Sequence, residues 1–155
     1  MPKSCDNKSV GMLVWQNDKL LLIERKKPPF GFAPPAGHVD KDTSFEVAAK
    51  RELEEEVGLE VKNIEFLIEG RKDNPCRREG GSWHYWKIYQ IEATGEIKRS
   101  EDETKQAIFY KKEDLLLLAS KTEKYFRGDI EQNEWEKSPG LEPVWYEWLK
   151  ELKTI

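Results

Sequence analysis

Residues 37–59 have the sequence GHVDKDTSFEVAAKRELEEEVGL, and this stretch decides which fold and which chemistry to expect. Its apolar residues recur at the three- and four-residue spacing of a helix face, which predicts a helix over about 44–57. Thr43 and Glu46 have the spacing of a capping box, so Thr43 is the expected N-cap. Gly58 is suited to end the helix in the left-handed conformation. The stretch therefore predicts one helix with defined ends.

Three carboxylates share one face of this predicted helix. Glu52, Glu55 and Glu56 fall on overlapping arcs at about 100° per residue, whereas Glu54 points away. Like charges at this spacing destabilise a helix by about 0.2–0.5 kcal/mol per pair, and Arg51 is the only adjacent cation. A cluster of carboxylate oxygens is the kind of ligand set that binds Mg²⁺ or Mn²⁺. Such an ion can polarise a phosphoryl oxygen and activate a bound water. The pattern favours cleavage of a phosphate by water, and the alternative is a solvated acidic helix face.

The sequence on both sides of this helix predicts a mixture of strands and helices. Strands are expected at 10–15, 20–24, 61–69, 83–93 and 107–110, and further helices at 112–126 and 144–152. The stretches 26–37, with four prolines and two glycines, 70–82 and 95–106 are expected to be irregular, and 1–8 to be frayed. The expected class is α/β (α+β), as one domain over 1–155 with a C-terminal helical extension over 119–155.

Composition narrows the class of partner. The net charge of −4 disfavours a general nucleic-acid binder, whereas a small phosphorylated substrate needs only a local cluster of cations. No apolar run approaches the ~18 residues of a membrane span, so no membrane partner is expected and the expected location is the cytoplasm. Cys5 and Cys76 are then expected to be free thiols. Together with His38 and His84 they lack the sequence spacing of a zinc motif, so no zinc site is expected.

The stretch over 37–59 resembles the Nudix box, Gly-x5-Glu-x7-Arg-Glu-U-x-Glu-Glu-x-Gly-U, in which U is aliphatic. Eight fixed positions match: Gly37, Arg51, Glu52, Leu53, Glu55, Glu56, Gly58 and Leu59. Thr43 stands where the box has its first Glu. The preceding loop from Phe32 also looks like the segment that leads into the box, and the resemblance covers about 9–118.

This resemblance to Nudix (MutT-like) hydrolases implies an α/β/α sandwich with a mixed sheet. It also implies hydrolysis of a nucleoside diphosphate linked to another group, with Mg²⁺ or Mn²⁺. Glu52, Glu55 and Glu56 would be the metal ligands together with the carbonyl of Ala36. Arg51 would orient a glutamate, and because of Thr43 we expect it to use Glu55 or Glu46, or to stand free.

Residues beyond the box are further candidates. The same resemblance implies one more carboxylate, as metal ligand or general base, from the loop before a late strand, which would be Glu103, with Glu101 and Asp102 as alternatives. Arg25 is expected to contact phosphate, near Gly37, whose backbone can meet phosphate, and His38, which can contact phosphate or metal.

Other groups are assigned more loosely from the sequence. The loop cations Arg71, Lys72, Arg77 and Arg78 could touch phosphate or ribose, although a solvated loop is the default. The aromatic residues of 83–93 are mostly expected in the core, and those of 135–148 are expected to cover the sheet, with a cleft cap or a dimer surface as alternatives.

The expected partner is a small-molecule nucleotide, with no nucleic acid, and a homodimer stays open. Two other functions also remain open: a Nudix domain that senses a nucleotide without cleaving it, and an RNA 5′-end pyrophosphohydrolase. The sequence does not choose among nucleoside triphosphates, ADP-ribose, dinucleoside polyphosphates and capped RNA. The three crowded carboxylates favour the enzyme over the sensor.

Overall fold

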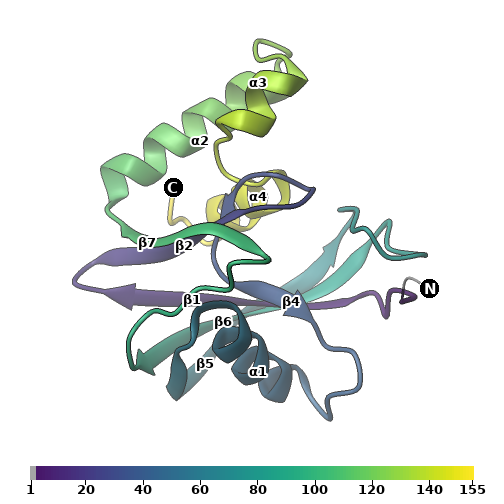
Figure 1. The fold of residues 1–155 in the computed structure, drawn as a ribbon, viewed down its shortest axis with the longest axis vertical. Helices are drawn as coiled ribbons and strands as arrows, with labels where there is room; N and C mark the ends of the chain where they lie inside the picture. Colours follow the sequence, from purple (N-terminus) through teal and green to yellow (C-terminus); the bar gives the residue numbers. More distant parts are fainter. Residues whose placement is uncertain (1–2) are drawn as a thin grey trace.

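A mixed sheet with helices on both faces forms the molecule in the computed structural model, which describes residues 3–155 (Figure 1). The strands are β1 (Lys8–Gln16), β2 (Lys19–Arg25), β3 (Phe32–Ala33), β4 (Ala36–His38), β5 (Glu60–Lys72), β6 (His84–Thr94) and β7 (Thr104–Tyr110). The helices are α1 (Phe45–Val57), α2 (Lys112–Phe126), α3 (Gln132–Lys137) and α4 (Pro143–Glu151). The expected α+β class with a mixed sheet is confirmed.

The strand order through the sheet is β3-β2-β1-β6-β5, while β4 pairs with β1 and β7 pairs with β2. β1 and β2 form the expected antiparallel hairpin, and Asn17 and Asp18 at its turn have φ values of 50° and 61°. Two left-handed residues at a two-residue turn match the natural twist of a hairpin. β1 runs parallel to β6, which makes the sheet mixed.

Alternation along the strands divides the core between the two faces of the sheet. Val10, Met12 and Val14 of β1 pack on the same side as α1, whereas Leu13 packs on the side of α2 and α4. Gly11 also faces that second side, where a Cβ would overlap the Trp145 indole of α4. Figure 1 shows this layering, with α1 against one face and α2 and α4 against the other.

The ends of α1 are fixed by one hydroxyl and one glycine. Ser44 is the N-cap, because its Oγ accepts a hydrogen bond from the Val47 N–H at 3.1 Å. The expected capping role of Thr43 is therefore wrong by one residue. Gly58 ends the helix with a φ of 74°, and its N–H donates to the Glu54 carbonyl at 2.9 Å, as expected of a left-handed cap. The buried face of the helix consists of Ala48, Ala49, Leu53 and Val57.

The Pro-rich stretch 26–37 is not entirely irregular. Phe32 and Ala33 pair with β2, and the strand that begins at Ala36 pairs with β1. Pro34 and Pro35 separate these short strands, where no ladder hydrogen bond from their nitrogens is needed. The chain therefore adds two short strands to the sheet just before α1, and the second of them, β4, contacts that helix.

The N-terminal segment is ordered where the structure describes it, contrary to the expected fraying of 1–8. Cys5 N–H donates to the Glu79 carbonyl at 2.7 Å, and Asn7 Nδ2 donates to the carbonyls of Gly80 and Trp83 at 2.9 and 2.8 Å. These bonds attach residues 3–7 to the loop before β6. Residues 1 and 2 lie outside the described part of the chain.

The C-terminal region covers the sheet. Trp135, Trp145 and Trp148 are fully buried, and the latter two belong to the core on the α2 side. The short helix α3 was not expected from the sequence. Within residues 3–155, none of the helices combines the length and the apolar character needed to cross a membrane.

Candidate active site

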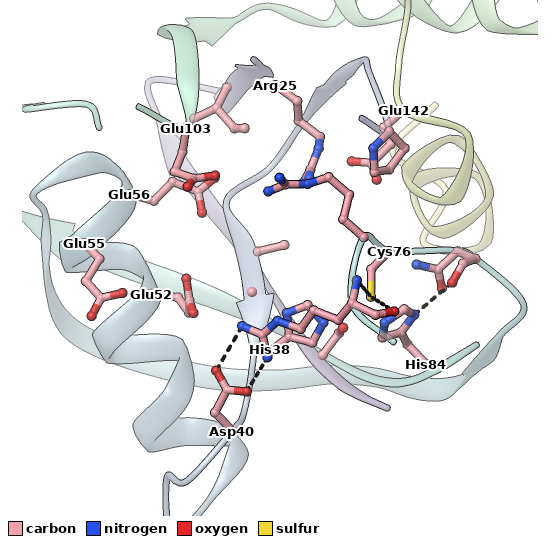
Figure 2. Close-up of a pocket in the computed structure, with 18 of the residues that line it drawn as sticks. Arg25, His38, Asp40, Glu52, Glu55, Glu56, Cys76, His84, Glu103 and Glu142 are labelled. Carbon is pink, nitrogen blue, oxygen red and sulfur yellow. Dashed lines mark hydrogen bonds and ion pairs between the residues drawn. The ribbon is translucent and has the colours of Figure 1, made fainter. Parts of the chain in front are cut away.

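One pocket of about 540 Å³ gathers all nine candidate residues (Figure 2). It lies where the second half of α1 meets β4, the end of β2, the segment before β7 and the loop before β6. The candidates that line it are Arg25, Ala36, Gly37, His38, Arg51, Glu52, Glu55, Glu56 and Glu103. The fold thus brings together residues separated by up to 78 positions, since Arg25 and Glu103 lie at opposite ends of this set.

The nearby arginines do not fully compensate the negative charges of the α1 carboxylates. Burial raises the pKa of Glu52 to about 7, although the neighbouring Arg51 opposes this rise. Burial and the proximity of Glu52 raise the pKa of Glu56 to about 8, although Arg25 and a hydrogen bond with the Ala36 backbone oppose it. Raised carboxyl pKa values indicate a location where a cation would be stabilised.

Gly37 is required by the position of Glu52. A Cβ at Gly37 would overlap the Glu52 carboxyl group, so a larger residue would displace this carboxylate from the pocket. The close approach expected at this glycine therefore occurs, and the group that approaches it is the Glu52 side chain.

Arg51 donates to four acceptors, and two of them, Asp42 and the His38 carbonyl, were missed by the sequence reasoning. Its Nε donates to Asp42 Oδ2 at 2.8 Å, and its Nη1 donates to Glu52 Oε1 at 2.9 Å and Glu55 Oε2 at 3.1 Å. Its Nη2 donates to the His38 carbonyl at 2.9 Å. Asp42 thus supplies the carboxylate that the box lacks at the next position. Of the alternatives, the pairing with Glu55 is found.

Arg25 lies between two groups of carboxylates. Figure 2 shows its side chain between Glu56 and Glu103 on one side and Glu142 on the other. The Arg25 Nε is buried without a hydrogen-bond partner among residues 3–155. Burial raises the pKa of Glu142, and the attraction of Arg25 opposes the rise. Glu142, at the start of α4, also lines the pocket and was missed from the sequence because it lies far from the box.

Glu103 is the only one of the three expected loop carboxylates that lines the pocket. Its side chain is 53% exposed and forms an ion pair with Lys27 Nζ at 3.7 Å. Glu101 instead contributes its backbone carbonyl to Lys26 Nζ at 2.9 Å. Glu103 therefore combines access to solvent with a position beside Glu56 (Figure 2).

The loop before β6 adds cations to the pocket wall. Arg77 and Arg78 line the pocket, and Arg78 is paired with Asp40 through both terminal nitrogens. The other two loop cations have partners outside it: Arg71 pairs with Asp73, and Lys72 pairs with Glu151.

Of the four aromatic residues expected mostly in the core, Trp86 and Tyr89 are buried there, whereas Trp83 is half-buried and Tyr85 is exposed. Trp86 is 4% exposed and Tyr89 is 3% exposed, and the Trp86 Nε1 donates to Asn74 Oδ1 at 3.0 Å. Tyr85 is directed elsewhere, because its hydroxyl donates to Glu69 Oε2 at 2.7 Å. Trp86 alone of these residues reaches the pocket lining.

The sequence argument against a site formed by the two cysteines and two histidines does not hold in the fold. One ligand atom from each of Cys5, His38, Cys76 and His84 lies within 4.8 Å of the others. The four residues come from separate segments of the chain, so their sequence spacing carries no information about this arrangement.

Comparison with known proteins identifies similar sequences and folds. The NUDIX domain model matches residues 6–132. The ADP-ribose pyrophosphatase of Methanocaldococcus jannaschii is 32% identical over 122 residues, which are 77% of this chain and 70% of that protein. The crystal structure of MutT NUDIX hydrolase from Burkholderia pseudomallei superposes with a TM-score of 0.61 at 22% identity, over 69% of this chain and 84% of that one. A NUDIX hydrolase from Nitrosomonas europaea gives a TM-score of 0.61 at 19% identity, over 79% and 89%. At this identity the structures support a shared fold.

Proposed function

Because this chain belongs to the NUDIX domain family and is therefore a hydrolase of phosphoric anhydride bonds, we propose that it is a metal-dependent pyrophosphohydrolase that cleaves a nucleoside diphosphate linked to another moiety. The observation that carries the proposal is the single pocket lined by Glu52, Glu55, Glu56 and Glu103. Arg25 and Arg77 line the same pocket, and guanidinium groups suit the oxygens of a diphosphate.

The residues present fit a hard divalent cation. NUDIX hydrolases generally use divalent metal ions, and the proposed ion is Mg²⁺ or Mn²⁺. The raised pKa values of Glu52 and Glu56 indicate uncompensated carboxylates, and oxygen is the preferred ligand of such ions. Glu52, Glu55 and Glu56 would hold the metal together with the Ala36 carbonyl, with Glu103 as a further ligand or as the general base. When bound, the metal would supply charge neutralisation for the diphosphate and acidity to a coordinated water.

The chain itself would orient the reactants. Arg51, fixed by Asp42 and the His38 carbonyl, would hold Glu52 and Glu55 in place. Arg25 would bind an oxygen of the diphosphate, while Gly37 and His38 form the adjacent wall. Glu103 would accept the proton of the attacking water as the new P–O bond forms and the anhydride P–O bond breaks. Each product then carries a terminal phosphate.

ADP-ribose is the first substrate to test. The name of the relative from Methanocaldococcus jannaschii, ADP-ribose pyrophosphatase, supports this choice. The pocket volume of about 540 Å³ lies within the range of small-molecule sites.

The test is hydrolysis of a panel of ADP-ribose, a dinucleoside polyphosphate and a nucleoside triphosphate, with Mg²⁺, Mn²⁺ or EDTA. Glu56→Gln removes one charge from the pocket, and Glu54→Gln is the matched control because Glu54 is exposed on the same helix. We expect EDTA to abolish cleavage and Glu56→Gln to lower kcat/KM by at least ~10²-fold, with Glu54→Gln close to the parent. Nucleotide binding without turnover, unchanged in Glu56→Gln, would instead identify a sensor.

A further inference from the structure

A second cluster of metal-ligating groups lies on the wall of the pocket opposite the glutamates. Figure 2 shows Cys76, His38 and His84 gathered on the side away from Glu52, Glu55 and Glu56. Cys5 completes the cluster from the N-terminal segment, and the four ligand atoms lie within 4.8 Å of one another.

The spacing of these atoms is close to that of a tetrahedral zinc site. Zn–S bonds of about 2.3 Å and Zn–N bonds of about 2.0–2.1 Å give tetrahedral edges of about 3.4–3.8 Å. The Cys5 Sγ and His84 Nε2 atoms, at 3.3 Å, are already near this separation. Contraction by about 1 Å at the widest edge would complete the geometry.

His84 presents the correct nitrogen to the cluster. Its Nδ1 lies 2.9 Å from the Asn74 carbonyl, and a carbonyl can only accept, so Nδ1 carries the proton. Nε2 therefore has a free lone pair that faces Cys5. An N–H directed at a backbone carbonyl is the usual outer support of a metal-bound histidine.

His38 brings a nitrogen that lacks any other partner. Its Nε2 is buried without a hydrogen bond among residues 3–155, and its ring centroid lies 5.5 Å from that of His84. A buried polar atom without a hydrogen-bond partner destabilises the folded state. A cation at the centre of the cluster would satisfy it.

A backbone N–H donates to each of the two sulfurs. The Asn7 N–H donates to Cys5 Sγ at 3.3 Å, and the Arg78 N–H donates to Cys76 Sγ at 3.4 Å. The Cys76 N–H donates to the Gly81 carbonyl at 2.7 Å and closes the turn between these two residues. A Cβ at Gly81 would overlap Cys76 Sγ, so this turn leaves room for the sulfur only because residue 81 is glycine.

We propose that Cys5, His38, Cys76 and His84 bind one thiophilic divalent cation of the zinc class, on the wall of the pocket opposite the glutamates and separate from the carboxylate ligands. Two thiolates and two imidazoles are a preferred ligand set of zinc, whereas Mg²⁺ and Mn²⁺ prefer the oxygens of the glutamates. With four protein ligands the site is closed, which is the arrangement of a structural zinc. This inference does not depend on the proposed hydrolysis.

The site connects the N-terminal segment to two parts of the pocket wall, β4 and the loop before β6. His38 follows Gly37, and its carbonyl holds Arg51, while Cys76 precedes the pocket residues Arg77 and Arg78. A cation at the cluster would therefore fix the arginine-bearing loop and β4 relative to α1.

The test is Co²⁺ substitution of the reduced full-length protein. A tetrahedral S₂N₂ site gives intense visible d–d bands and thiolate-to-cobalt charge transfer in the near ultraviolet, which oxygen ligands cannot produce. We expect about one Co²⁺ or Zn²⁺ per chain at this cluster, with about two sulfurs at ~2.3 Å and two nitrogens at ~2.0–2.1 Å by X-ray absorption of the protein with one equivalent of zinc. Cys76→Ser should lose the charge-transfer band and at least ~10²-fold in affinity, whereas the control Glu56→Gln should keep both.

Several outcomes would overturn the proposal. One is the lack of charge-transfer bands in the reduced parent protein, and another is a spectrum that Cys76→Ser leaves unchanged. A third is a Cys5–Cys76 disulfide whose reduction does not lead to metal uptake. If Cys76→Ser fails to fold, X-ray absorption of the parent decides alone, because sulfur and oxygen ligands differ in distance and scattering.

Discussion

Arg51 shows how a contact can be kept when a motif residue changes. Thr43 occupies the position of the first Glu of the Nudix box, yet Asp42 reaches the Arg51 Nε at 2.8 Å. The carboxylate has moved by one residue along a segment that precedes the helix, where the backbone can adapt. Arg51 consequently remains anchored on the side away from Glu52 and Glu55.

We expect the replacement of the box Glu by Asp42 as the partner of Arg51 to have measurable effects on kcat/KM. Asp42→Ala should lower kcat/KM about tenfold, because Arg51 loses one of the contacts that fix the glutamates. Thr43→Glu alone should change kcat/KM only a few-fold, and it should restore activity when combined with Asp42→Ala. Steady-state kinetics with Mg²⁺ would measure all three. A rise of several hundred-fold in Thr43→Glu would show that the Asp42 contact does not replace the missing Glu.

Three of the four glutamates among the nine predicted pocket residues could be placed from local geometry, whereas Glu103 was expected from the family resemblance. Glu52, Glu55 and Glu56 lie on one helix, so helical spacing alone places them on one face. Glu142 could not be found in this way, since it reaches the pocket only because α4 packs against the sheet. Local periodicity therefore predicts a site within an element, and tertiary packing adds the rest.

At the level of elements, α1 was predicted almost to its observed limits, but its cap was misplaced. Thr43 and Ser44 both carry a hydroxyl that can cap, and the sequence pattern favoured the capping box with Glu46. In the structure Ser44 adopts the extended conformation, with φ −155° and ψ 165°, and its Oγ accepts from Val47 N–H. Asp42 and Thr43 are thereby left outside the helix.

The cap assignment predicts unequal effects of two neighbouring substitutions. Ser44→Ala should lower the free energy of unfolding by about 1 kcal/mol, because the Val47 N–H loses its acceptor. Thr43→Ala is the matched control and should change it by less than about 0.5 kcal/mol. Urea unfolding of the metal-free proteins measures both, and the opposite order would return the cap to Thr43.

The short strands β3 and β4 were not predicted, because two or three residues carry no periodicity. Each exists through pairing with a distant strand, β3 with β2 and β4 with β1. This pairing is functionally important, since β4 contributes Ala36, Gly37 and His38 to the pocket.

At the scale of the whole molecule, long-range proximity is what the sequence could not provide. The four residues of the proposed zinc-class site are spread over 80 positions, from Cys5 to His84, and no helical or strand spacing relates them. Only the fold brings them together, whereas linear zinc motifs can be recognised from spacing.

The C-terminal region belongs to the same architecture. Trp145 and Trp148 of α4 pack against Trp86, and their ring centroids lie 5.5 and 6.4 Å, respectively, from that of Trp86. This packing holds Glu142, at the N-cap of α4, in the pocket beside Arg25. The extension thus supports the sheet and supplies a buried carboxylate.

That carboxylate should make stability depend on pH. Burial raises the folded-state pKa of Glu142 above its ordinary value of 4.5. Between the unfolded and folded pKa values the native state holds a proton that the unfolded chain has released, so stability falls as pH rises through this window. Glu142→Gln removes this dependence. It should therefore unfold at a higher urea concentration than the parent at about pH 8, and the difference should disappear below about pH 4.

Urea midpoints of the metal-free parent and Glu142→Gln, measured across this range, test the argument, with Glu147→Gln in the same helix as the exposed control. A parent that is the more stable of the two at about pH 8 would mean that the attraction of Arg25 outweighs burial. The Glu142 carboxylate would then be a net stabilising partner of Arg25, and Arg25 would be less free to bind phosphate. The sign of the difference between the two urea midpoints at about pH 8 thus decides whether Arg25 mainly stabilises the Glu142 carboxylate or is available to bind phosphate.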